Sequence, residues 1–381
     1  MRAFFKIAII NIVVCYVLIE VTSWAVIQTG YIPARKPSFT PTQYDRTWIP
    51  PFADINPEWG VWHLPSVRTH YQNTCFRINY VTNSYGARDR ERTKTGDTNR
   101  IVVLGDSFME GFGVEEADRF STLLEKKTGA ECLNFATSGG FGPTQYYLVY
   151  KHLAKQFAHN RLIVGVLPAN DFVDDKVAFG DAHYRPFWNG TYPKYELAYS
   201  LPDVNQSDFT PDKQKQTIET TSYKLYEFLK AYTYWFNIVN YYRQRGGEPT
   251  SDLMPSYFYD YSAEELNKLK YSLKQIREEA GDKEVLVLLI PIKSDFIRFG
   301  QEKRPTSRLY NELSSFCREQ QVQLLDLLAA TDKQEDVSDL FISCDGHWSE
   351  YGNAYYASLL TRYLSAEPAK DTSLVADRNS R

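Results

Sequence analysis

The sequence predicts an α/β domain in which helices cover both faces of a parallel sheet. Short apolar runs that do not alternate with polar residues are typical of strands buried on both faces. Five such runs occur, at residues 101–104, 132–135, 162–167, 284–290 and 322–325. Helical segments separate the runs, and this alternation predicts right-handed crossovers within one sheet. We therefore expect a three-layer α/β/α domain with a five-stranded parallel sheet.

The expected helices are justified by their end signals. Residues 118–127 begin with an acid and end with lysines, in agreement with the helix dipole. Ser262 is placed to cap a helix over 263–280, with Glu265 completing a capping box. Further helices are expected at residues 144–157, 222–243, 307–319 and 353–364.

A segment before this domain is long and apolar enough to enter a membrane. The run from Ile7 to Ile27 is mostly apolar and follows Arg2 and Lys6, which favour an amino terminus in the cytoplasm. The run exceeds a usual signal-peptide core and no small-x-small cleavage site follows it. Residues 1–30 are therefore interpreted as an uncleaved anchor, with a cleaved signal peptide as the alternative. The anchor would cross the cell (inner) membrane once, and the rest of the chain would lie on the side of this membrane that faces away from the cytoplasm.

The remaining chain divides by composition. Residues 31–99 form a stalk and extension rich in proline and aromatic residues, residues 100–366 form the α/β domain, and residues 367–381 form a polar tail that we expect to be disordered. Residues 172–215 show no persistent period and are read as an insertion. Its aromatic residues, including Tyr184 and Trp188, are expected to form a lid or substrate wall.

Composition and motifs exclude several classes of function. The 381 residues carry a net charge of -4, so nucleic acid is not an expected partner. Metal-binding Cys-x-x-Cys and His-Glu-x-x-His motifs are absent, as are a phosphate-binding loop and a complete dinucleotide fingerprint. We expect no cofactor and no metal. The histidines at 63, 70, 152, 159 and 183 have no acidic or cysteine partner at ligand spacing and are interpreted as surface or packing residues.

Cysteine spacing does not fix a disulfide. Apart from Cys15 in the apolar segment, the chain has four cysteines, and their pairing cannot be read from sequence. We expect Cys317 to pair with Cys344. Cys132 lies in a predicted core strand and is expected to be a free buried thiol.

Polar residues follow four of the predicted strands at the edge where open α/β sheets bind their ligands. Gly105 permits a sharp turn that places Ser107 at the end of the first strand. Gly139 and Gly140 follow the second strand and Asn170 the third. The last segment carries Asp345 and His347.

These four segments, in this order, resemble the blocks of the SGNH (GDSL) hydrolase superfamily. The blocks are Gly-Asp-Ser, Asn-Phe-Ala-Thr-Ser-Gly-Gly, Pro-Ala-Asn-Asp and Asp-Gly-His-Trp, and the resemblance covers residues 101–364. Residues 83–91 also look like the Asn-x-x-Gly-x-Arg-Asp-x-Glu stretch that precedes the serine block in many bacterial members. The resemblance implies a flavodoxin-like hydrolase domain.

The resemblance also implies roles for the site residues. Ser107 would be the nucleophile and His347 its base, because a serine hydroxyl needs a base within hydrogen-bond reach. Asp345 would orient the imidazole. The backbone N–H groups of Ser107 and Gly139 and the Asn170 side chain would form the oxyanion hole, where losing one donor typically costs about 10²–10³ in rate. The expected activity is a serine esterase that removes an acyl or acetyl group from an envelope polysaccharide or glycolipid.

One departure from the family pattern keeps two alternatives open. The usual spacing is Asp-x-x-His, but Cys344 stands three positions before His347 and Asp345 two positions before it. This spacing resembles the Asp-x-His-Trp variant of the alginate acetyltransferase-like branch. An O-acyltransferase that works with a membrane acyl-donor partner is therefore the second hypothesis, and a Ser-His dyad without the acid is the alternative site. An inactive glycan-binding module is the third hypothesis.

Overall fold

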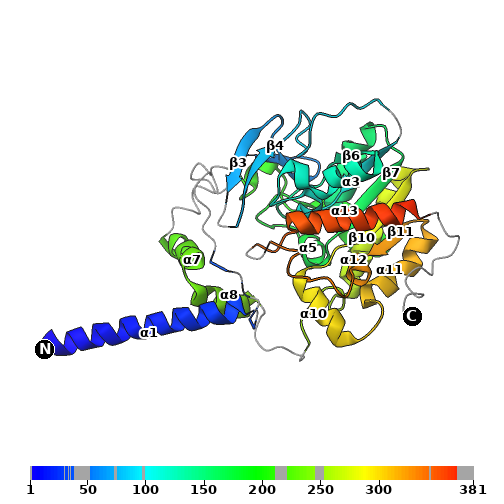
Figure 1. The fold of residues 1–381 in the computed structure, drawn as a ribbon. Helices are drawn as coiled ribbons and strands as arrows, with labels where there is room; N and C mark the ends of the chain where they lie inside the picture. The colour runs from blue at the N-terminus through cyan, green and yellow to red at the C-terminus, as the bar shows by residue number, and fades with distance from the viewer. Residues whose placement is uncertain are drawn as a thin grey trace.

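The computed structural model describes residues 2–29, 31–32, 34, 36–37, 52–72, 75–96, 99–210, 221–244, 253–342 and 345–366. Figure 1 shows a helix, α1 (Arg2–Gln28), that projects from a body of helices and strands. Within the described residues, one helical segment, Phe4–Gln28, is long and apolar enough to cross a membrane. The expected polar tail, residues 367–381, lies outside the described residues.

The body contains the predicted five-stranded parallel sheet. Its strands are β5 (Arg100–Leu104), β6 (Glu131–Asn134), β7 (Arg161–Val166), β10 (Glu284–Leu289) and β11 (Gln323–Asp326). They lie in the order β11-β10-β7-β5-β6, and all four pairings are parallel. Numbered along the chain, this is the flavodoxin-like order 2-1-3-4-5. The predicted fold class is confirmed.

Each strand sends alternate side chains into two separate cores, one on each face of the sheet. Val102 and Leu104 pack with residues of α4 (Pro143–His152), α9 (Ala263–Ala280) and α11 (Arg308–Glu319). Ile101 and Val103 pack with residues of α3 (Phe120–Thr128) and α13 (Glu350–Ser365). The predicted capping box of Ser262 and Glu265 at the start of α9 is confirmed.

Short helices that were not predicted follow four strands directly. They are α2 (Ser107–Glu110), α5 (Pro168–Asp174), α10 (Lys293–Glu302) and α12 (Leu327–Ala330). All four begin at the edge of the sheet where the parallel strands end, which we call the carboxyl edge. The three shorter helices, α2, α5 and α12, span at most seven residues, too few turns to show an amphipathic period. Single-turn 3-10 helices occupy Glu116–Asp118, Ala154–Gln156 and Val204–Gln206.

The segment before β5 forms two small antiparallel sheets. One pairs β1 (Ala53–Asn56) with β2 (Gly60–His63), and the other pairs β3 (Arg68–Gln72) with β4 (Arg77–Val81). Phe52 stacks on Tyr80 with ring centroids 3.6 Å apart, in a small core of their own with Ile78. In the described part of this segment, the prolines do not prevent short strands.

Two stretches of the insertion region differ from the prediction. Residues expected to be irregular form an antiparallel hairpin of β8 (Pro186–Thr191) and β9 (Lys194–Tyr199). The single helix expected over 222–243 is two helices, α7 (Thr221–Tyr232) and α8 (Tyr234–Gln244), with a break at the buried Thr233. The hairpin was missed because its turn lies at Tyr192-Pro193 rather than at a glycine pair.

The expected pairing of Cys317 with Cys344 is wrong. Cys317 is a free, buried thiol on the inner face of α11, and burial raises its pKa to about 12. Cys344 lies outside the described residues. Cys132 is free and buried, as predicted, whereas Cys75 is disulfide-bonded.

Candidate active site

The turn after β5 places a serine at the carboxyl edge. Gly105 has φ +151°, and a Cβ atom there would lie 2.5 Å from Cγ of Met109, so only glycine fits the turn. Asp106 caps α2 by accepting a hydrogen bond from the Phe108 N–H at 3.0 Å. Ser107 is the first residue of α2 and is 7% exposed. The nucleophile candidate is thus held by the turn and by the start of α2, with most of its surface covered.

A histidine and an acid meet this serine although they lie 240 residues away along the chain. His347 Nε2 is 2.8 Å from Ser107 Oγ, and His347 Nδ1 makes a short hydrogen bond with the Asp345 carboxylate. Asp345 is 2% exposed and His347 20%. The spacing of two residues therefore lets the acid reach the ring.

The loop that carries His347 is fixed by its own backbone and by aromatic packing. The Ile342 N–H donates to the His347 carbonyl at 2.8 Å, and Gly346 N–H donates to the Ile342 carbonyl at 2.8 Å. The rings of Phe108 and Phe112 lie 5.0 and 5.1 Å from the imidazole. Because these contacts orient the ring, Nε2 points at the serine.

This arrangement can carry out nucleophilic catalysis. With the Asp345 carboxylate accepting the Nδ1–H, the neutral imidazole presents the lone pair of Nε2 to the serine hydroxyl. Nε2 can then take the hydroxyl proton as the oxygen attacks. Among the described residues, no group of three or more His, Cys, Asp or Glu side chains is placed to hold a metal ion.

Two further predicted residues lie beside the nucleophile turn. Asn170, an exposed residue of α5, donates from Nδ2 to Asp106 Oδ2 at 3.3 Å, so its amide contacts the residue before Ser107. The loop after β6 is tied to the same turn, because the Thr137 N–H donates to the Gly105 carbonyl at 3.1 Å. Gly139, two residues further on, is exposed with φ +101°. Both are on the segments expected to supply oxyanion donors.

Asp106 is a site residue that sequence reasoning missed. Its carboxyl is buried, and burial raises its pKa to about 7. The Phe108 N–H and the Asn170 amide both donate to it, so it connects the cap of α2 to the asparagine. In the sequence, Gly-Asp-Ser reads as ordinary turn chemistry, and only the fold brings Asn170 to this carboxyl.

The expected substrate wall is not where we predicted it. Trp188 is 5% exposed, packs on Tyr147 and Tyr271, and donates from its indole N–H to Ser272 Oγ at 2.8 Å. Tyr184 is 7% exposed and donates from its hydroxyl to the Pro57 carbonyl at 2.6 Å. Both rings are held in the interior, so neither offers a face to a sugar. Tyr184 and Trp188 therefore serve packing.

The stretch from Asn83 to Glu91 braces the nucleophile helix. Asn83 Oδ1 accepts from the Tyr85 and Ala87 N–H groups at 3.0 and 3.1 Å, which closes the turn. The buried Arg88 guanidinium donates to the carbonyls of Gly111 and Val114, both at 2.7 Å, just after α2. The motif resembling the bacterial family members therefore has a structural role at the end of α2.

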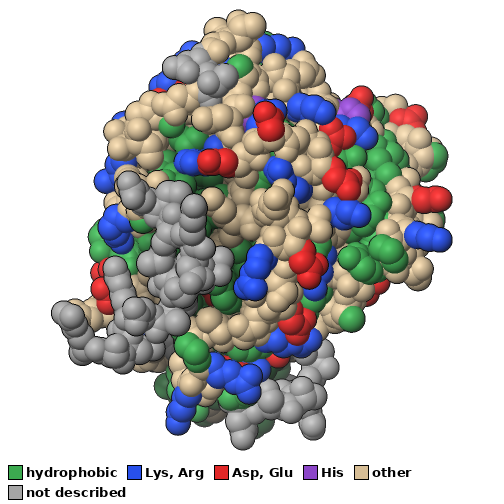
Figure 2. Space-filling view, turned by 90° about the vertical axis from the view of Figure 1, so that its right-hand side faces the viewer, with side chains coloured by type: hydrophobic (Ala, Val, Ile, Leu, Met, Phe, Trp, Pro, Cys, Tyr) green, Lys and Arg blue, Asp and Glu red, His purple; other side chains and the backbone are tan. Residues whose placement is uncertain are grey.

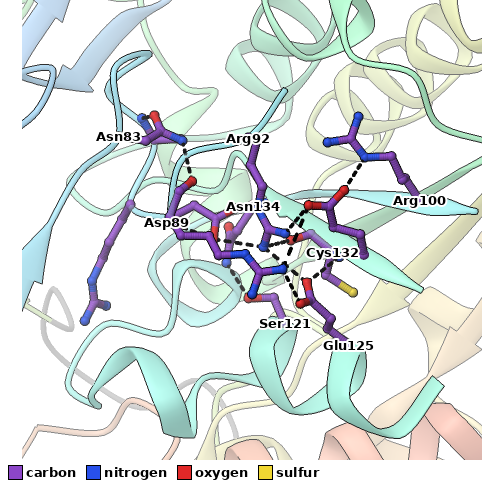
Figure 3. Close-up of polar contacts among 12 residues, drawn as sticks. Asn83, Asp89, Arg92, Arg100, Ser121, Glu125, Cys132 and Asn134 are labelled. Carbon is purple, nitrogen blue, oxygen red and sulfur yellow. Dashed lines mark hydrogen bonds and ion pairs between the residues drawn. The ribbon is translucent and has the colours of Figure 1, made fainter. Parts of the chain in front are cut away.

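A buried polar network continues from this stretch to the sheet (Figure 3). Arg92 donates to Asp89 at 2.8 Å, to Glu125 at 3.2 Å and to the Cys132 carbonyl at 2.7 Å. Asp89 accepts from the Asn134 N–H at 3.2 Å, and Asn134 Nδ2 donates to the Met109 carbonyl in α2 at 2.9 Å. The extension, β6 and the nucleophile helix are thus joined by hydrogen bonds.

Three histidines have acidic partners that the sequence analysis did not predict: His152 pairs with Glu58 at 2.7 Å, His183 with Asp181 at 3.4 Å, and the buried His63 with Glu110. His63 Nε2 lies 3.3 Å from Glu110 Oε1, three residues after the nucleophile, and Tyr80 donates a short hydrogen bond to the same carboxylate. His63 Nδ1 lies 2.9 Å from the Gly86 carbonyl. His63, Tyr80 and Glu110 are all buried. His63 packs inside, as expected, but its acidic partner comes from a distant segment.

Among the comparisons with known proteins, only solved structures of low similarity match the chain. No protein-family model and no curated protein matches the chain. Among solved structures, a member of the lipolytic protein G-D-S-L family from Veillonella parvula is 10% identical, with a TM-score of 0.37, and the match covers 70% of this chain and 98% of that one. The lipase/acylhydrolase from Enterococcus faecalis is 11% identical, with a TM-score of 0.36, over 70% and 95% of the two chains.

A carbohydrate esterase family 2 enzyme from Corynascus thermopiles, with its carbohydrate binding domain, is 12% identical. Its TM-score is 0.37, and the match covers 72% of this chain and 68% of that one. At such identities and TM-scores a likeness carries no functional weight. The function inferred below therefore rests on the geometry of this chain.

Proposed function

We propose that the chain is an SGNH-type serine hydrolase that cleaves a carboxylic ester. The observation that carries the proposal is the contact of 2.8 Å between Ser107 Oγ and His347 Nε2, with Asp345 on the other ring nitrogen. A serine, an oriented imidazole and a buried acid in hydrogen-bonded series form a unit that activates a hydroxyl at neutral pH.

In the proposed reaction, Ser107 Oγ attacks the ester carbonyl while its proton passes to His347 Nε2. The N–H groups of Ser107 and Gly139 and the Asn170 amide donate to the oxyanion. The intermediate collapses as the alcohol leaves with the proton from the imidazolium, which leaves an acyl group on Ser107. Water, deprotonated by His347, then attacks the acyl-serine and releases the acid.

The proposed location is the outer side of the cell membrane, with α1 as anchor. The disulfide of Cys75 supports an oxidising compartment, since disulfides are rare in the cytosol. The cations Arg2 and Lys6 before α1 support a cytoplasmic amino terminus. This location supports an ester carried by an envelope polysaccharide or glycolipid as substrate. Stacking on Tyr184 and Trp188 no longer supports it, because both are buried.

The test is turnover by the full-length protein in detergent, with p-nitrophenyl acetate and acetylated sugars as substrates. Ser107→Ala should lower kcat by about 10⁴-fold or more, and His347→Gln by a similar factor, because members of such a unit act together. Thermal unfolding of both variants should match the wild type, which excludes misfolding. A fluorophosphonate probe should add to Ser107 alone. Equal turnover by wild type and Ser107→Ala would reject the proposal.

The second candidate is an O-acyltransferase, in which a sugar hydroxyl replaces water in the last step. One observation favours the acyltransferase: Asp345 forms a hydrogen bond with His347 although only one residue separates them. This Asp-x-His spacing resembles that of the alginate acetyltransferase-like branch. Because both reactions share the acyl-serine, only the products separate them. In the presence of an acceptor glycan, a transferase gives acylated glycan at the expense of free acid, whereas a hydrolase gives free acid alone.

A further inference from the structure

The helix pair α7–α8 exposes an apolar surface that the proposed reaction does not use. The exposed fractions are 56% for Leu225 and Phe228, 55% for Tyr232, 51% for Val239 and 52% for Tyr242. Nine of the 24 residues from Thr221 to Gln244 are aromatic. Tyrosine and tryptophan are enriched where proteins meet the headgroup region of a bilayer. An exposed patch of this kind marks an interaction surface.

Two asparagines of the pair make hydrogen bonds within it instead. Asn237 is 4% exposed, and its amide donates to the Thr233 carbonyl at 2.7 Å and to the Lys230 carbonyl at 2.9 Å. Asn240 donates to the Tyr226 hydroxyl at 3.1 Å. Since these groups are satisfied inside the pair, the outer surface can enter a weakly hydrated environment at little cost.

The pair is docked on α1 through Glu20, an acidic residue within the apolar helix. Glu20 Oε2 accepts the N–H of Tyr234, the first residue of α8, at 2.8 Å, and Glu20 Oε1 accepts the Tyr16 hydroxyl at 3.2 Å. A carboxylate at a helix start also interacts favourably with the helix dipole. Figure 1 shows α8 beside the end of α1, with α7 next to it.

The position of Glu20 along α1 sets the level of α8 in a membrane. The apolar segment begins at Phe4. Because a helix rises 1.5 Å per residue, Glu20 lies about 24 Å further along the helix axis. The hydrocarbon layer of a bilayer is about 30 Å thick. The docking point therefore lies in the outer part of the bilayer. Trp24, 48% exposed, follows one turn later, where an interfacial aromatic is expected.

We propose that α7 and α8 form a membrane-interface helix pair, whose exposed apolar side chains rest in the outer leaflet of the bilayer that α1 spans. This inference rests on the proposed anchoring by α1, and not on the ester chemistry. The occupant is lipid, because the patch is continuous with the apolar α1 and lies at the level where the bilayer ends.

Two attachments would orient the body relative to the membrane. In Figure 1, α5 and α10, which follow strands at the carboxyl edge, lie on the side of the body nearest α8. The face turned away from α1 carries intermixed basic and acidic side chains on its described surface (Figure 2), as expected for a surface in water. The candidate active site would thus face esters held at the membrane surface.

The test uses full-length protein in phosphatidylcholine vesicles, with an environment-sensitive fluorophore on single added cysteines. Phe228→Cys and Val239→Cys report on the pair, and Leu197→Cys, on the exposed hairpin strand β9 with 39% exposure, is the matched control. All three are made with Cys15→Ser, because Cys15 is exposed whereas Cys132 and Cys317 are buried. The Cys15→Ser chain alone gives the labelling background.

We expect blue-shifted emission at positions 228 and 239, quenched several-fold more by nitroxide-labelled lipid than emission at position 197. Water-like emission at all three positions, in protein that still floats with the vesicles, would overturn the inference and point to a protein partner absent from pure lipid. Protein that fails to float would overturn the anchoring itself. Turnover of p-nitrophenyl acetate by the labelled variants tests the ester chemistry separately.

Discussion

The carboxyl edge of the sheet and the α7–α8 pair differ in which side chains they bury. The edge buries polar side chains, whereas the pair exposes apolar ones. At the edge, Asp106 and Glu110 are buried and hydrogen-bonded. On α7 and α8, the apolar side chains of Phe228 and Val239 are more than half exposed. A buried polar group is costly unless it is paired, whereas an exposed apolar group gains from being covered.

This difference indicates where the side chains of each region find their contacts: within the chain at the edge, and outside the chain at the pair. At the edge, Asp106 and Glu110 find hydrogen-bond partners within the chain, in α2, in α5 and in the extension. The pair leaves Leu225, Phe228 and Val239 more than half exposed, so its apolar surface can still be covered by something outside the chain. Three experiments can break or sharpen this comparison.

The largest effect is expected at the acid of the candidate triad. Asp345→Asn should keep the ring in place but disfavour the productive tautomer, and should lower kcat by about 10⁴-fold. The measurement is kcat for p-nitrophenyl acetate. Asp339→Asn, a change at an exposed acid of the same segment, should leave kcat unchanged. A loss below tenfold for Asp345→Asn would favour a Ser-His dyad.

The next effect concerns the network that braces the edge. Arg92→Met removes the buried cation that Asp89 shares with Glu125 and leaves Asp89 with Arg119 alone, so it should lower the free energy of unfolding by about 3 kcal/mol. Arg161→Met, which breaks the more exposed pair with Glu284, is the control and should cost less than about 1 kcal/mol. Urea unfolding measures both. Similar losses for the two variants would mean that the buried network has no special role.

The smallest effect is a pH dependence of stability. Burial raises the pKa of Asp326, which caps α12, to about 7. The folded state therefore keeps a proton that the unfolded chain loses near its ordinary pKa, and stability falls as pH rises through this interval. Between pH 5 and 7 the loss from this group should be about 2 kcal/mol.

Asp326→Asn should flatten this part of the profile, since asparagine keeps the cap without a charge. Thermal unfolding at pH 5, 6 and 7 measures the difference. A variant profile parallel to that of the wild type would show that other groups cause the pH dependence.

Much of the body was predictable because its signals are local. The five strands show as uninterrupted apolar runs, and α9 begins at the capping box that Ser262 and Glu265 announce. Ser107, Asn170 and His347 were recognisable because each stands at the end of a predicted strand or in a motif of fixed spacing. The break between α7 and α8 at Thr233 was not recognisable from the sequence, because neither glycine nor proline occurs there.

The sequence by itself determined the α/β class, the strand ends that carry polar residues and the apolar segment at the start. These properties follow from hydrophobic period and turn chemistry, which act between neighbours. Only the tertiary structure decided that Asp345 reaches the His347 ring, that Trp188 packs inward and that Glu20 holds α8. Such contacts join segments distant in sequence, and burial and hydrogen bonding between them exist only after the chain has folded.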